Sequence, residues 1–192
     1  MREGEFFTVM SDRHTAALIL ALYDADRPIV MKDLQRITNH TQTLRQRLDR
    51  MEEDGIVDIQ ITYEPHKFVK ISLNDTGKEI ALLVSMMNSI IPGDDIEEKS
   101  INMRYADPIM RMLRGKEYVV QKDIKAIMPY YDSITKVLKR MESEGLVTIS
   151  EPDEGYRVIR YSLTSKGKQV ADAFESIFKK IEAARSENRS DL

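Results

Sequence analysis

Two stretches of the sequence place polar and charged side chains on one face of an expected helix. The first stretch ends at Gly55, a residue that suits the left-handed turn at a helix C-terminus, and its apolar residues Leu44, Leu48 and Met51 recur at spacings of four and three and form the inner face of an amphipathic helix. The outward positions are Thr41, Gln42, Arg45, Gln46 and Asp49. Arginine can donate two hydrogen bonds to guanine, and glutamine can donate one to adenine and accept one from it, so this face has the chemistry to read base edges in a major groove.

The second stretch has Ile134, Leu138 and Met141 on its inner face and ends in the same way at Gly145. The outward positions are Tyr131, Asp132, Thr135, Lys136 and Lys139. Lysine is a compact point charge, which favours contact with phosphate over readout of bases. For both stretches the alternative is a solvated helix face that binds nothing.

These two helices belong to an internal repeat. The sequence LDRMEEDGIVDI at 48–59 reappears as LKRMESEGLVTI at 138–149, and SLNDTGKEIA at 72–81 reappears as SLTSKGKQVA at 162–171. Both pairs are 90 residues apart, and we expect this offset to hold without a gap across 14–81. Self-similarity at a fixed offset indicates a duplicated structural unit.

Each copy predicts the same order of elements. In the first copy a helix ends before Pro28, an apolar step follows at 29–30, and a short second helix precedes the third helix that ends at Gly55. Alternating apolar residues then predict a β-hairpin, and a polar segment at 74–76 caps a fourth helix. The expected fold class is mainly α with small β-hairpins, that is, α+β.

The repeat also predicts the domain boundaries. We expect a first domain at 8–91 and a second at 104–189, the second with a long C-terminal helix. Between them, residues 92–103 contain Pro92-Gly93-Asp94-Asp95, which breaks the fourth helix and predicts an exposed linker.

The order of elements and the repeated stretches resemble the winged helix-turn-helix superfamily, most of all the MarR-type and related archaeal and bacterial regulators. The resemblance is carried by Leu48–Val57 with Asp75–Lys78, and again by Leu138–Val147 with Ser165–Lys168. It implies two tandem winged helix domains in a DNA-binding transcriptional regulator. The third helix of each would enter the major groove of double-stranded DNA.

The resemblance also implies that basic residues on the hairpin tips, or wings, contact the DNA backbone. Lys67 in the first wing and Arg157 in the second are the candidates. Acidic neighbours such as Glu64 and Glu154 repel phosphate and argue against this contact.

The charge of the chain leaves a second class of function open. The formal net charge is −3, which is unusual for a nucleic-acid-binding protein. Residues 14–91 hold nine Lys and Arg against eleven Asp and Glu, a net −2, whereas residues 104–185 hold sixteen against twelve, a net +4. The alternative is therefore a protein-interaction scaffold with a protein partner, like the ScpB-like condensin-associated subunits or subunits of the transcription machinery.

The C-terminal helix carries an apolar stripe that exceeds the needs of a small core. Its members are Val170, Phe174, Ile177, Phe178 and Ile181. The stripe is explained either by packing on its own or the sister domain, or by a homodimer through the C-terminal helix.

Enzymatic and membrane functions are not expected. The chain has no cysteine, and its three histidines, at 14, 40 and 66, have no metal-ligand spacing, so we expect no metal, no cofactor and no catalysis. No apolar run reaches the length of about 20 residues that a membrane helix needs. The expected location is cytoplasmic and nucleoid-associated.

Overall fold

The first repeat folds in the order that its sequence predicts. The computed structural model describes residues 7–63, 68–127, 131–150 and 158–190. Elements of the first repeat are the 3₁₀ helix η1 (Val9–Ser11), α2 (Thr15–Ala25), β1 (Ile29–Val30), α3 (Met31–Thr38), α4 (Thr41–Glu53), β2 (Val57–Thr62), β3 (Phe68–Leu73) and α5 (Asp75–Ile90). The strands β2 and β3 form the predicted hairpin, and Asn74 caps α5 by accepting a hydrogen bond from the backbone N–H of Gly77 at 2.8 Å.

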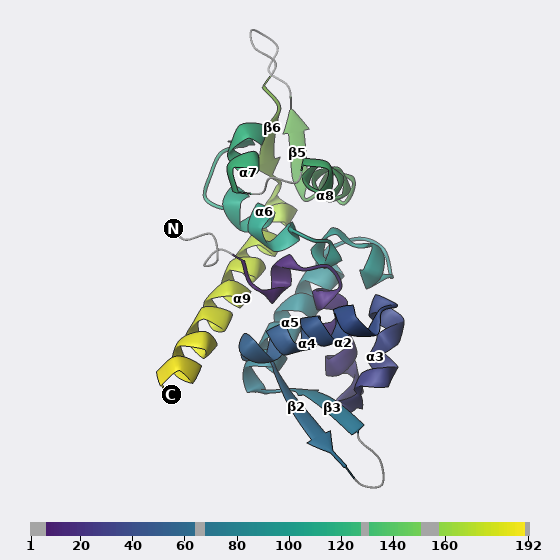
Figure 1. Ribbon diagram of the computed structural model, residues 1–192. Coiled ribbons are helices and arrows are strands. Elements are labelled where there is room, and N and C mark those ends of the chain that lie inside the picture. The colour runs from purple at the N-terminus through teal and green to yellow at the C-terminus, as the bar shows by residue number, and fades with distance from the viewer. Residues whose placement is uncertain (1–6, 64–67, 128–130, 151–157, 191–192) are drawn as a thin grey trace.

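The second repeat has the same order after a short connector. Its elements are η3 (Ser100–Asn102), α6 (Ala106–Leu113), β4 (Val119–Val120), α7 (Gln121–Ile127), α8 (Tyr131–Ser143), β5 (Val147–Ser150), β6 (Arg160–Leu163) and α9 (Ser165–Ser190). The described residues are mostly helical and contain two small antiparallel sheets, so the predicted α+β class is confirmed. The two hairpins extend from opposite ends of the molecule (Figure 1).

Each sheet places its third strand in the middle, in the orders β1-β3-β2 and β4-β6-β5. In the first sheet Ile71 lies opposite both Ile29 and Ile59, and it is fully buried. Tyr161 has the matching place in the second sheet, opposite Val119 and Ile149. The short first strand therefore attaches each hairpin to the helices of its own repeat.

The inner faces of the third helices are buried as predicted. In α4, Leu44, Leu48 and Met51 are fully buried, and their counterparts in α8 are buried too. Both helices end at a glycine with positive φ, +67° at Gly55 and +71° at Gly145. Glycine is the residue that adopts this left-handed backbone at least cost, so the predicted C-terminal turns are confirmed.

The offset of 90 does not hold at the start of the first helices. His14 and Tyr105, which are 91 residues apart, are the residues just before α2 and α6, and both have a φ of 71°. The N–H of His14 donates to the carbonyl oxygen of Asn102 at 3.1 Å, and the N–H of Tyr105 donates to that of Ser11 at 2.8 Å. Ser11 and Asn102 are also 91 residues apart, so this reciprocal pair of hydrogen bonds joins the repeats with local twofold symmetry.

The prediction of an exposed connector is wrong for its second half. Residues 92–103 contain a further 3₁₀ helix, η2 (Ile96–Glu98), besides η3, and the four residues 99–102 are buried. The Lys99 ammonium group donates to the carbonyl oxygen and to the side-chain oxygen of Asn88, at 2.6 and 2.7 Å. This second half of the connector is buried because it lies in the contact between the two repeats.

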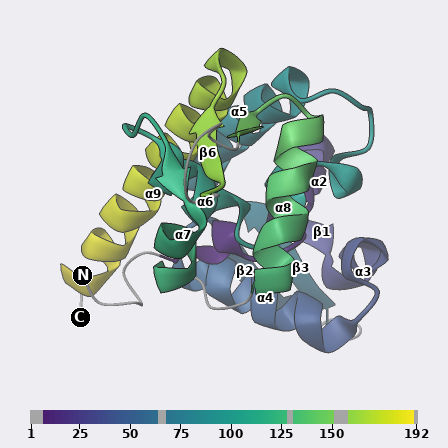
Figure 2. The same ribbon diagram turned by 90° about the horizontal axis from the view of Figure 1, so that it is seen from above.

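The long helix α9 packs against α5 of the first repeat and α6 of its own. Seen from above, α9 and α8 lie on opposite flanks with α6 between them (Figure 2). Four members of its apolar stripe are buried within the chain, namely Val170, Phe174, Ile177 and Ile181. Lys180 of α9 pairs with Glu79 of α5. Packing within the chain, against both α5 and α6, thus accounts for these four members of the stripe that suggested a homodimer.

Candidate nucleic-acid interface

The start of α4 presents its polar side chains to solvent. Thr41, Gln42, Arg45 and Gln46 are all exposed. The side chain of His40, the residue before the helix, accepts no hydrogen bond from the first turn, so the first backbone N–H groups have no side-chain cap. This end of α4 combines the donors and acceptors of its side chains with the positive end of the helix dipole.

Arg45 is only loosely held in place. Its Nε lies 3.9 Å from a carboxylate oxygen of Asp49, one turn along the helix, and both side chains are more than half exposed. An exposed pair of this kind contributes about 0–1 kcal/mol. Arg45 can therefore leave Asp49 for another acceptor at little cost.

The matching face of α8 is basic. Lys136 and Lys139 are exposed, and neither makes an ion pair with any residue that the structure describes. Thr135 is half-buried. Tyr131 begins the helix, but its side chain lies outside the described residues.

The predicted wing contacts cannot be placed, because Lys67 and Arg157 both lie outside the described residues. Nearer the base of the second hairpin, the guanidinium group of Arg160 lies over the ring of Tyr118, 4.6 Å from its centroid. This arginine is therefore held against the sheet.

A second basic feature beside α4 was not predicted from the sequence. It is a pocket of about 290 Å³, here called the arginine pocket, lined by Asp12, Arg13, Thr43, Gln46, Arg47, Arg50 and Arg104. Asp12 pairs with both Arg47 and Arg50.

The concentration of positive charge affects the neighbouring histidine. Burial lowers the pKa of His14, and the charges of Arg13 and Arg47 lower it further. Burial likewise lowers the pKa of Arg47, and repulsion from Arg50 and Arg104 opposes the attraction of Asp12.

Part of this pocket had a signal in the sequence. Thr43, Arg47 and Arg50 recur at spacings of four and three, which places them on one side of α4 next to its apolar stripe. Arg13 and Arg104 hold the same place in the two repeats, counted at the offset of 91. Their meeting depends on how the repeats pack, which no local pattern contains.

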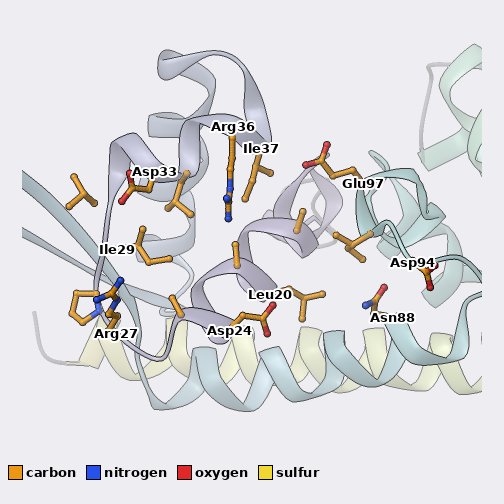
Figure 3. Close-up of a pocket in the computed structure, with 17 residues that line it drawn as sticks. Leu20, Asp24, Arg27, Ile29, Asp33, Arg36, Ile37, Asn88, Asp94 and Glu97 are labelled. Carbon is orange, nitrogen blue, oxygen red and sulfur yellow. The ribbon is translucent and has the colours of Figure 1, made fainter.

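A broad open cavity of about 1130 Å³ lies on another side of the first repeat, between α2, α3 and the connector. Figure 3 shows Arg36 directed from α3 into this cavity, whose lining also includes Leu20, Asp24, Asp94 and Glu97. The cavity does not include the outward face of α4.

Two further features were searched for in the described part of the chain, a metal-binding cluster and a membrane-spanning helix. No three His, Asp or Glu side chains within it converge as a metal site. None of the helices described combines the length and the apolar character that crossing a membrane requires.

Comparison of the chain with protein-family models, with curated proteins and with solved structures found no match.

Proposed function

We propose that the chain is a DNA-binding transcriptional regulator built from two tandem winged helix domains, with α4 and α8 in the major groove. The observation that carries the proposal is the exposed start of α4. Thr41, Gln42, Arg45 and Gln46 pack against no core, and the helix end beside them has no side-chain cap. Side chains of these types at the start of a helix suit readout of base edges.

The second helix adds affinity rather than the same readout. Lys136 and Lys139 of α8 suit phosphate oxygens, whereas Arg45 and Gln46 of α4 suit bases. Because α4 and α8 carry different outward residues, the two helices would engage successive major grooves about 34 Å apart and prefer an asymmetric site. Such a regulator would act in the cytoplasm at the nucleoid.

A protein-interaction scaffold remains the second candidate, because exposed apolar side chains favour it. Leu82 and Met86 lie one turn apart on α5 and are 56% and 43% exposed. Tyr63, at the end of the first hairpin, is 70% exposed. Exposed apolar groups that gather on one face mark protein interfaces in general.

Fluorescence anisotropy with labelled random-sequence duplex DNA, titrated with the protein at two salt concentrations, separates the two functions. We expect binding that weakens steeply with salt, because phosphate contacts release counterions. Selection from a random library then defines the preferred site. A folded protein that fails to bind DNA at low salt would exclude the regulator and favour the scaffold.

A further inference from the structure

The side chains that line the arginine pocket carry more positive than negative charge. Four guanidinium groups line it, from Arg13, Arg47, Arg50 and Arg104, against the one carboxylate of Asp12. Burial and the nearby arginines lower the pKa of His14 beside the pocket, which disfavours a further positive charge there. Holding like charges together destabilises a fold unless an anion offsets the repulsion.

The pocket also has hydrogen-bond donors beyond those that Asp12 uses. Each guanidinium group has five N–H donors in a fixed fork that matches the oxygens of a phosphate group. Asp12 accepts from Arg47 and Arg50, whereas the exposed Arg13 makes no hydrogen bond or ion pair with any residue that the structure describes. The pocket volume of about 290 Å³ is roughly ten times the share of one water molecule in the liquid, so a phosphate group fits.

The place of the pocket indicates where the phosphate group comes from. Gln46 belongs both to the pocket lining and to the exposed face of α4. An anion held in the pocket therefore lies next to the face assigned to base readout, where backbone phosphates flank a helix in the major groove.

We propose that the arginine pocket binds a phosphate group and, resting on the proposed function, that this group belongs to the backbone of bound DNA. Arg13 and Arg104 come from the two repeats, so the pocket would set the register of the whole chain on the duplex. A free phosphate compound offers the same oxyanion, and the experiment has to distinguish these two sources.

The test compares the double variant Arg13→Ala/Arg104→Ala with the control Arg27→Ala/Lys116→Ala. All four side chains are exposed and both variants lose two positive charges, but the control residues lie outside the pocket. Two titrations are made, one with random-sequence duplex DNA over a salt series and one with inorganic pyrophosphate at constant ionic strength. Thermal melting of each variant verifies that it is folded.

We expect the double variant to bind DNA at least tenfold more weakly than the control, with unchanged sequence preference. The slope of its salt dependence should fall by about 0.9, the contribution of a single neutralised phosphate. Arg13→Lys/Arg104→Lys should recover the salt dependence, since it keeps the charge. If the double variant binds DNA with the wild-type salt dependence, the arginine pocket does not bind a DNA phosphate, and the proposed function is unaffected.

The pyrophosphate titration separates the remaining cases. If the wild-type protein binds no DNA but is stabilised by pyrophosphate, and the double variant is not, the pocket takes a free phosphate compound and the proposed function fails. If neither DNA nor pyrophosphate binds, both proposals are overturned.

Discussion

Asp54 and Glu144 hold equivalent positions at the ends of α4 and α8, and each accepts a backbone N–H from the start of a 3₁₀ helix. The N–H of Val9 donates to Asp54 at 2.8 Å, and the N–H of Ser100 donates to Glu144 at 2.9 Å. The two carboxylates differ in their other partners. Arg185 of α9 donates to Asp54 at 2.6 and 2.9 Å, so Asp54 also ties the C-terminal helix to the first repeat.

We predict that Asp54→Asn lowers the free energy of unfolding by about 2 kcal/mol, because hydrogen bonds to charged groups contribute about 1.5–3 kcal/mol. The buried Asp54 loses its charge opposite Arg185, which is 23% exposed. Asp172→Asn is the control, since its pair with Arg114 is exposed on both sides and should contribute little to stability. Denaturant unfolding of both variants gives the comparison, and equal losses would contradict the assignment.

A glycine near the start of α5 is a second point of strict constraint. A Cβ atom at Gly77 would lie 2.0 Å from the carbonyl oxygen of Ile56, and at Gly167 it would lie 1.9 Å from that of Leu146. We predict that Gly77→Ala destabilises the protein by about 3 kcal/mol, because the helix must move away from the backbone. Lys78→Ala changes an exposed neighbour and should stay within about 0.5 kcal/mol. Chemical denaturation measures both, and a Gly77→Ala variant as stable as the wild-type protein would exclude this close approach.

The glycine shows how far local patterns reach. The sequence predicts that a polar segment at 74–76 caps a helix, which the structure confirms, but the contact of Gly77 with Ile56 that requires glycine is a tertiary one. The inner stripe of α4 and the turn at Gly55 were predictable for the same reason, since periodicity and backbone conformation are local.

The contact between the repeats was beyond the reach of those patterns. Pro92 and Gly93 predict an exposed connector, and they are indeed exposed. Ser100 and Asn102, however, are buried, and they form hydrogen bonds with Glu144 and with α2, respectively. Polar residues become buried where partners far along the chain satisfy them, and a local composition rule counts them as solvent-exposed. Arg13 and Arg104 meet through the same contact, so only part of the arginine pocket was foreseeable.

The pKa of His14 predicts a dependence of stability on pH. Burial and two arginines lower this pKa in the folded protein below its ordinary value of 6.5. The unfolded chain then binds a proton at a pH where the folded chain does not, so stability is lost as pH falls below about 6.5. We expect the melting temperature to drop between about pH 7 and about pH 5.5. The drop should be smaller in His14→Asn, which keeps a residue that tolerates the φ of 71°.

The matched control for this measurement is His40→Asn, which removes an exposed histidine before α4. Thermal melting over a pH series gives the melting temperature of the wild-type protein and of both variants at each pH. Identical pH profiles for His14→Asn and the wild-type protein would show that His14 does not carry the effect.

Removal of the exposed lysines on the basic face of α8 should lower the affinity for all DNA sequences alike. Lys136→Ala/Lys139→Ala should weaken binding to all duplexes alike and reduce the slope of the salt dependence by about 0.9 for each phosphate that a lysine neutralises. Anisotropy over a salt series measures the slope, and Lys116→Ala, exposed in the same repeat, is the control. A change of sequence preference with an unaltered slope would instead place these lysines on bases.

Arg45 of α4 should act in the opposite way. Two hydrogen bonds from a guanidinium group to guanine discriminate against other bases by about 1–3 kcal/mol. Arg45→Ala should therefore relax the preference at one position of the selected site and leave binding to random duplex nearly unchanged. Arg27→Ala, which removes an equally exposed arginine away from α4, should keep the preference intact. The two variants are compared on duplexes that carry each base pair at that position, and an unchanged preference in Arg45→Ala would remove this residue from base readout.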